Sequence, residues 1–411
     1  MKTFKELYDS LVSCALNGLD LETQVEYDPF QLDCLLNPSK HPLVVQTGKC
    51  NCTKEKTKEC VSKCPFGAIS EVDSGGISIN PELCVGCEQC IDGCAGEKLT
   101  QSTDIIPALK AIRAAKGPVY ALIAPAFLGQ FSSDVTPGKL RSALKRVGFD
   151  GMLEVALFAD ILTLKEALEF DKNIRTESDF QLTSCCCPMW IAMIRKVYNQ
   201  LMPHLPGSVS PMIASGRTVK LLHPDALTVF IGPCLAKKAE AREIDLAGAV
   251  DYVLTFREVQ NIFDALGIRP VEMEESEKDH SSRVGRIYAR VGGVSEAVEK
   301  TVNRLNPDRS ITVRTKHADG VPACKEMMND LLAGKLEANF YEGMGCKGGC
   351  VGGPRSVTGA DEGSRLVDIY GDLSPYPTPI ENTYVIELLH RLGIDTVEGL
   401  LEDTEIFTRR F

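Results

Sequence analysis

The chain has 411 residues, of which 44% are hydrophobic and 25% charged, and these proportions exclude wholesale disorder. At roughly 150 residues per domain, this length predicts two to three domains. The formal net charge of −11 argues against nucleic acid or an anionic membrane as the main partner.

The sequence shows no targeting or membrane segment. The longest nearly apolar run, residues 119–129, is too short to span a bilayer. The N-terminus lacks the apolar segment and small-residue cleavage site of a signal peptide. We therefore expect a cytoplasmic protein with no membrane contact.

The composition divides the chain into four parts. Residues 1–45 have helical periodicity, residues 46–103 hold eight cysteines, and the chain from 104 onward alternates between strand and helix patterns. We place a further boundary near residue 370, so that 371–411 forms a C-terminal helical segment on the domain of residues 104–370.

Within the long domain, buried strands are predicted at 119–124, 227–231 and 251–256. An amphipathic helix is predicted at 139–147, and a helix follows the third strand. A last helix is predicted at 383–392, with Ile386, Leu389 and Leu392 on one face. Alternating strands and helices indicate sheets covered by helices.

Seventeen cysteines are the most unusual feature of the composition. They are clustered, and in a cytoplasmic protein clustered cysteines indicate metal ligands or redox groups more often than disulfides. None of the six histidines lies at a zinc-ligand spacing from a cysteine cluster, which argues against mixed Cys/His zinc sites.

The N-terminal cysteines include Cys84, Cys87, Cys90 and Cys94, a C-x2-C-x2-C-x3-C run that resembles the bacterial ferredoxin signature for 4Fe–4S clusters. The upstream half is irregular, because Cys50 and Cys52 are one residue apart. By analogy with the crossed ligation of two-cluster ferredoxins, one cluster takes Cys50, Cys52, Cys60 and Cys94. The other takes Cys64, Cys84, Cys87 and Cys90. The alternative is that the first site is degraded.

Three further cysteine clusters lie far apart in the sequence. They are Thr183-Ser184-Cys185-Cys186-Cys187-Pro188-Met189-Trp190, Gly232-Pro233-Cys234-Leu235-Ala236-Lys237-Lys238, and Glu342-Gly343-Met344-Gly345-Cys346-Lys347-Gly348-Gly349-Cys350. Each follows or opens a predicted element, so the three loops can present cysteines to one buried cluster. Glycines in the third loop allow close backbone approach to a bulky cofactor.

These motifs resemble the three signatures of the FeFe hydrogenases, TSCCPxW, MPCxxKxxE and ExMACxGGCxxGG. Gly232 stands in place of Met, Gly345 in place of Ala, and Cys185 is an extra thiol. The resemblance covers about residues 46–355. It implies an α/β (α+β) catalytic domain with mixed or parallel sheets flanked by helices, and a small N-terminal ferredoxin-like domain with two 4Fe–4S clusters.

The resemblance also implies an H-cluster, in which a 4Fe–4S cube is joined to a two-iron unit with carbonyl, cyanide and a dithiolate amine. The implied ligands are Cys187, Cys234, Cys346 and Cys350, with Cys350 as the bridge. Lys237 would donate to a cyanide, while Lys238 is expected to be a solvated surface lysine. Met344 and Pro125 would wall the open iron position, with ordinary core packing as the alternative for Met344. Ala124, Pro125 and Ala126 would offer backbone donors.

For protons, the resemblance implies Cys186 as first carrier, because a thiol pKa near 8.5 can be tuned toward neutrality. If the first motif is aligned from Thr183-Ser184 instead of from Pro188, this role shifts to Cys185. Glu166 and Glu169, one helical turn apart, follow; the alternative is an exposed acidic helix face. The outer relay positions hold Pro206 and Asn173, so the outer relay looks broken.

The implied activity is reversible oxidation of dihydrogen, with electrons passed to ferredoxin-like or other carriers. Dihydrogen, protons and hydrogenase maturation proteins are the implied partners. A hydrogen sensor of low turnover, which would need a signalling partner, is the main alternative, and a non-catalytic iron–sulfur assembly protein is the third. Lys237, Met344 and Cys186 argue against the third, since they would have no two-iron unit to serve.

Overall fold

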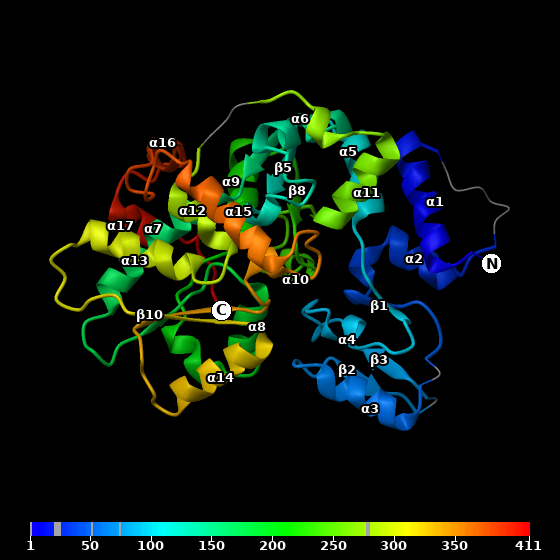
Figure 1. Cartoon of the computed structure of the whole chain (residues 1–411), viewed down its shortest axis with the longest axis horizontal. Helices are drawn as coiled ribbons and strands as arrows, with labels where there is room; N and C mark the ends of the chain where they lie inside the picture. The colour runs from blue at the N-terminus through cyan, green and yellow to red at the C-terminus, as the bar shows by residue number, and fades with distance from the viewer. Residues whose placement is uncertain (1, 20–25, 51, 74, 277–279) are drawn as a thin grey trace.

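The computed structural model describes residues 2–19, 26–50, 52–73, 75–276 and 280–411. Two parallel sheets form the framework of the large domain, and a small cysteine-rich lobe lies at one end of the molecule (Figure 1). No helix in the described part of the chain is long and apolar enough to cross a membrane.

The first sheet is parallel, with strand order β6-β5-β8-β9. Its strands are β5 (Val119–Ile123), β6 (Gly151–Glu154), β8 (Leu227–Gly232) and β9 (Tyr252–Thr255). The strands predicted at 119–124, 227–231 and 251–256 are therefore confirmed. Helices that cover this sheet are α5 (Ile105–Ala114), α6 (Pro137–Val147), α9 (Pro211–Leu222), α10 (Ala236–Ala241) and α11 (Phe256–Leu266).

Local signals explain where these helices begin and end. The Thr136 side chain accepts the Lys139 N–H at the start of α6, with Pro137 in the first turn. Gly148 ends the helix at φ +120°, a left-handed conformation that favours glycine. The helix predicted at 139–147 is confirmed, and it begins two residues earlier.

The second sheet is also parallel, with strand order β10-β11-β7. Its strands are β7 (Gln181–Leu182), β10 (Thr315–Asp319) and β11 (Phe340–Met344). Helices α8 (Pro188–Lys196), α13 (Gly293–Leu305) and α14 (Val321–Leu332) pack against it. The long helix α7 (Ala156–Asn173) contacts α9, beside the first sheet, and α13, beside the second.

The remaining helices of the large domain are α12 (Arg283–Arg286), α15 (Ala360–Asp372), α16 (Thr383–Arg391) and α17 (Val397–Glu402). The helix predicted at 383–392 is confirmed as α16, but it is not the last helix, because α17 follows it, and its predicted face is wrong. Val385 and Leu389 are buried, whereas Ile386 is 57% exposed. The boundary expected near residue 370 falls inside α15.

The cysteine-rich lobe contains two short antiparallel strand pairs. Strand β1 (Val44–Gln46) pairs with β4 (Leu99–Gln101), and β2 (Ile69–Glu71) with β3 (Ile77–Ile79). Its helices are α3 (Lys54–Lys63) and α4 (Gln89–Asp92). The preceding helices, α1 (Phe4–Asn17) and α2 (Pro29–Leu36), pack against α5 of the large domain.

Candidate active site and cluster sites

The three C-terminal cysteine motifs follow strands β7, β8 and β11. Cys234 comes directly after β8, Cys346 follows β11, and Cys187 lies beyond β7 at the start of α8. Because the strands of each sheet are parallel, their carboxyl ends share an edge, where ligands of open α/β sheets bind. The two sheets thus present all three motifs to one place.

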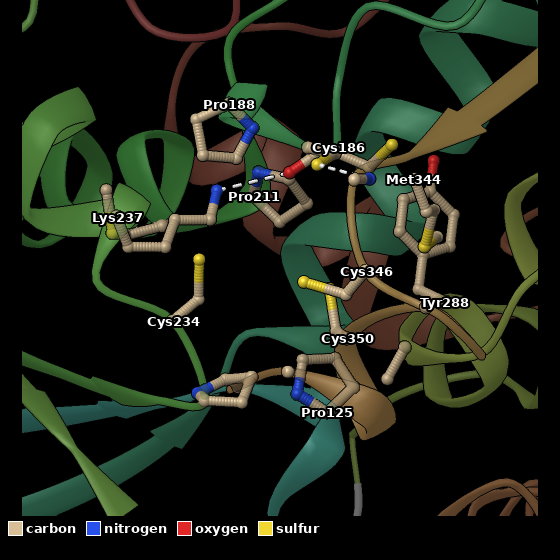
Figure 2. Close-up of a pocket in the computed structure, with 18 of the residues that line it drawn as sticks. Pro125, Cys186, Pro188, Pro211, Cys234, Lys237, Tyr288, Met344, Cys346 and Cys350 are labelled. Atoms are coloured by element: carbon tan, nitrogen blue, oxygen red, sulfur yellow. Dashed lines mark hydrogen bonds between the residues drawn. The ribbon is translucent and has the colours of Figure 1, made fainter. Parts of the chain in front are cut away.

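That place is a cavity of about 70 Å³, several times the roughly 15 Å³ that a water molecule needs. The predicted site residues on its wall are Ala124, Pro125, Cys186, Cys187, Cys234, Lys237, Met344, Cys346 and Cys350. Figure 2 shows Cys234, Cys346 and Cys350 pointing into the same space from two separate loops. Ala126 is buried beside the cavity, but it is not among the lining residues.

The four predicted cluster ligands lie on one apolar wall, where Cys187 is buried and Cys234, Cys346 and Cys350 are partly exposed. Burial and the neighbouring cysteines raise the pKa of Cys234 and of Cys350 to about 12, and that of Cys346 rises well above its usual range. The Gly345 N–H donates to Cys187 Sγ at 3.3 Å. Several thiolates can share so buried a place only if cations compensate their charge.

Within the described residues, no three His, Cys, Asp or Glu side chains are grouped so that they could hold a metal ion. The four thiols instead line the wall of a shared cavity. Four cysteines are the usual ligand set of a 4Fe–4S cluster. The residues present therefore fit an iron–sulfur cluster at this position.

The departures from the family signatures are matched by neighbouring side chains. A Cβ on Gly345 would lie 2.7 Å from the Met189 side chain, so Met189 leaves room only for glycine at this position. A Cβ on Gly232 would lie 2.5 Å from the Phe230 ring, and Phe230 lines the cavity. Both departures therefore belong to a packed cavity wall.

A buried carboxylate ties the third motif to the glycines at 292 and 293. Glu342, at 0% exposure, accepts the Gly292 N–H at 2.9 Å and the Ser295 N–H at 2.7 Å. These N–H groups belong to the start of α13, where a helix favours negative charge. Glu342 thereby fixes the position of β11, which leads to Cys346.

Lys237 lies on the cavity wall, and its ammonium group is already hydrogen-bonded. It donates to Glu240 Oε2 at 2.7 Å and to the Cys186 carbonyl oxygen at 3.2 Å. Two of its three N–H donors are thus engaged by the chain itself. The prediction that Lys238 is a solvated surface lysine was wrong, because Lys238 is fully buried and donates to Glu258 at 3.0 Å.

The wall at the end of β5 differs in part from the prediction. Ala124 donates its N–H to the Ile231 carbonyl oxygen at 2.9 Å, and proline has no N–H to donate. The expectation of backbone donors is therefore wrong for Ala124 and Pro125. Pro125 and Met344 both line the cavity.

The predicted proton carriers are connected through a residue that the sequence did not single out. Thr183 Oγ1 lies 3.4 Å from Glu166 Oε2 and 4.0 Å from Cys186 Sγ. Burial and neighbouring cysteines raise the pKa of Cys186 well above its usual range, so the thiol is protonated at neutral pH. The expectation of a thiol pKa near neutrality is wrong.

Cys185 provides a second connection to the same carboxylate. Its Sγ lies 3.0 Å from the Tyr288 hydroxyl and also contacts Glu166. Tyr288 lines the cavity, whereas Cys185 does not. Two short routes, through Cys186 and Thr183 or through Tyr288 and Cys185, therefore converge on Glu166.

Glu166 is fully buried, which excludes an exposed acidic face at this position. Burial raises its pKa to about 7, although its carboxylate accepts the Ser184 N–H at 2.8 Å. Glu169 is half-buried, and Lys165 donates to it at 2.6 Å. The second glutamate is thus held in an ion pair with a buried lysine.

The N-terminal cysteines lie in two groups. Cys50, Cys52, Cys60 and Cys94 line one small cavity between α3 and the chain that follows α4. In the other group, burial raises the pKa of Cys84, Cys87 and Cys90, and nearby Cys64 raises each of them further. Each set offers the four thiols that a 4Fe–4S cluster requires.

The two regions meet at Cys87. This residue lies close enough to Cys346, on the wall of the large cavity, to raise the pKa of that thiol. Sequence reasoning missed Thr183, Phe230 and Tyr288. Thr183 stands inside a recognised motif and could have been found there, whereas Phe230 and Tyr288 carry no local signal.

Comparison with known proteins identifies the family. The model of the iron only hydrogenase large subunit, C-terminal domain, matches residues 117–354. Iron hydrogenase 1 of Clostridium pasteurianum is 28% identical over 275 residues, 57% of this chain and 48% of that protein. The chain thus spans about half the length of that relative.

Some other similar proteins are named as iron–sulfur assembly components and not as hydrogenases. Cytosolic iron-sulfur assembly component 3 of Pongo abelii is 22% identical over 361 residues, 73% of this chain and 75% of that protein. The solved structure of an FeFe hydrogenase from Chlamydomonas reinhardtii superposes with a TM-score of 0.58 at 22% identity, covering 75% of this chain and 98% of that one. The fold of the catalytic domain is therefore that of the FeFe hydrogenases, and because the family model covers more than half of the sequence, the chain belongs to the iron-only hydrogenase family.

Proposed function

We propose that the protein is an FeFe hydrogenase that interconverts dihydrogen with protons and electrons at an H-cluster. One observation carries this proposal. A single buried cavity collects Cys187, Cys234, Cys346 and Cys350 together with Lys237, Met344 and Cys186. An iron–sulfur protein without a two-iron unit needs the four cysteines but has no use for the other three residues.

In this proposal Cys187, Cys234, Cys346 and Cys350 would hold the cube, and Cys350 would also bind the two-iron unit. When bound, the two-iron unit and its amine supply the heterolytic cleavage of dihydrogen. Lys237, fixed by Glu240, would offer an N–H donor to a cyanide ligand, since a cationic donor is strong in a dry site. Pro125, Met344 and Phe230 keep water from the remaining space.

The chain's own residues move the proton. Cys186 exchanges a proton with the cavity and passes it through the Thr183 hydroxyl to Glu166, whose pKa of about 7 suits it for accepting and releasing a proton. The alternative route runs through Tyr288 and Cys185 to the same carboxylate. Glu169 is the next acceptor on α7.

In this proposal electrons would pass between the active site and the surface through the two N-terminal clusters. Cys64, Cys84, Cys87 and Cys90 would hold the cluster nearer the cavity, since Cys87 lies close to Cys346. Cys50, Cys52, Cys60 and Cys94 would hold the cluster nearer the surface, where α3 is mostly exposed. The partner implied is a one-electron carrier of ferredoxin type. Maturation proteins would be needed to insert the two-iron unit.

A hydrogen sensor of low turnover is the second candidate. It is favoured by the outer part of the proton route, where Lys165 holds Glu169 in an ion pair and the next positions are Pro206 and Asn173. A slow proton exit limits turnover but does not prevent dihydrogen from binding. This candidate requires a separate signalling partner.

The test is an infrared spectrum of the anaerobically matured protein, first under argon and then under dihydrogen. We expect carbonyl and cyanide stretches that shift when dihydrogen is added. The turnover rate then separates catalyst from sensor. Absence of these bands, when a control hydrogenase matures normally, would overturn both candidates in favour of the assembly role.

A further inference from the structure

A buried ion pair joins the cysteine-rich lobe to the catalytic domain. Glu88 directly follows Cys87, and its side chain has 0% exposure. It pairs with Arg355, which lies five residues after Cys350 and is 15% exposed. The pair thus stands between the cluster site of Cys64, Cys84, Cys87 and Cys90 and the active-site cavity.

The surrounding backbone is tightly fitted. A Cβ on Gly86, which has φ +69°, would lie 3.1 Å from the backbone of Leu235 and Ala236. Arg355 also donates its N–H to the Pro233 carbonyl oxygen at 3.0 Å. The loop that carries Cys87 therefore packs against the loop that carries Cys234, and Arg355 contacts both.

The backbone of Glu88 is itself unusual, because φ is +63°, a left-handed conformation rarely adopted by residues other than glycine. Apart from the ion pair, neither carboxylate oxygen accepts a hydrogen bond from the described residues. A buried charge is costly unless an opposite charge accompanies it. Arg355 is the group that compensates Glu88.

We propose that the Glu88–Arg355 pair tunes the reduction potential of the cluster that Cys64, Cys84, Cys87 and Cys90 would hold, because the two charges of the pair cancel beside that cluster. Reduction adds one negative charge to the cluster. A buried carboxylate alone would oppose it and a buried guanidinium alone would favour it, and little solvent is present to screen either charge. The inference rests on the cluster assignment in the proposed function.

Single and double substitutions separate charge from structure. Glu88→Gln leaves the guanidinium, which stays protonated in proteins, without its counter-charge. The potential of this one cluster should rise. Arg355→Lys keeps a positive charge and should leave the potential near the wild-type value. Glu88→Gln combined with Arg355→Met removes both charges and should return the potential toward wild type.

Glu59→Gln is the matched control, because Glu59 precedes the ligand Cys60 as closely as Glu88 follows Cys87. Its side chain is 51% exposed and pairs with Lys56 at 3.0 Å. Solvent screens a charge at such a position, so the potential of the cluster held by Cys50, Cys52, Cys60 and Cys94 should shift much less.

The measurement is a redox titration of the reconstituted full-length protein followed by electron paramagnetic resonance, with iron counted in each variant. A rise confined to one cluster in Glu88→Gln, reversed in the double variant, supports the inference. An unshifted potential, or a shift that persists in the double variant, overturns it. A wild-type protein with normal iron content in the large cavity but no N-terminal cluster signals would instead refute the electron route of the proposed function.

Discussion

The two cysteine-rich regions of this protein are built in opposite ways. Around the active-site cavity, the cysteines come from loops held by two parallel sheets and a large continuous core. In the N-terminal lobe, the buried apolar cluster consists of Val44, Ile69, Ile77 and Leu99, with cysteines packed around it. The first scaffold folds on its own core and then presents ligands, whereas the second is too small to do so without its clusters.

The cavity linings follow the same division. The active-site cavity is lined by apolar side chains and cysteines, with Lys237 as its charged side chain. The small cavity of the N-terminal lobe is lined in addition by Lys56, Glu59 and Lys98. An apolar lining excludes water and strengthens every charge inside it, as the proposed chemistry on dihydrogen requires. A lining of exposed, charged side chains suits the proposed exchange of electrons with an external partner.

The largest effect should come from a ligand of the cavity. Cys234→Ser removes a soft thiolate from the cube, and we expect dihydrogen turnover to fall to background while the circular dichroism spectrum is unchanged. Cys324→Ser is the matched control, because Cys324 is a buried cysteine of the same domain that does not line the cavity. If Cys234→Ser kept its turnover, Cys234 would not be a ligand of the cube.

Iron removal should distinguish the two scaffolds. Anaerobic chelation should abolish amide hydrogen-exchange protection in β1 and β4, because cluster binding supplies much of the folding free energy of a small domain. Strands β5 and β8 should stay protected, since their core does not depend on iron. Equal loss of protection in both regions would refute the contrast drawn between them.

The proton route predicts a smaller, selective effect. Removing a group that transfers protons costs about 100-fold to 10,000-fold in rate. Cys186→Ala should lower turnover by at least about 100-fold with unchanged infrared bands, and Cys185→Ala should have little effect. The reverse result would show that protons pass through Tyr288 and Cys185.

Glu166 should make stability depend on pH. Its pKa rises from 4.5 to about 7 on folding, so its contribution to stability is fully present below pH 4.5 and is lost as the pH rises through 7. A shift of this size corresponds to on the order of 3 kcal/mol. Urea unfolding at pH 5 and pH 8 should show a larger decrease in the free energy of unfolding for wild type than for Glu166→Gln. Equal decreases would contradict the buried, raised-pKa carboxylate.

The sequence by itself determined three strands of the first sheet, the helices α6, α11 and α16, and the order of the cysteine motifs. These features are local, because apolar periodicity, helix caps and ligand spacing each depend on a short stretch of sequence. The same holds for Cys187, Cys234, Cys346 and Cys350, whose residue types already suit a cluster. Their meeting in one cavity follows from parallel strands that end at a common edge.

Other features were decided only by the tertiary structure, since they depend on residues far apart in the sequence. Lys238 is buried because Glu258, twenty residues later, lies beside it. Tyr288 contacts Cys185, which lies 103 residues earlier in the sequence. Glu88 pairs with Arg355 because the loops that carry them pack together in the fold. Burial sets the charge and the proton affinity of such groups, and burial is a property of the assembled fold.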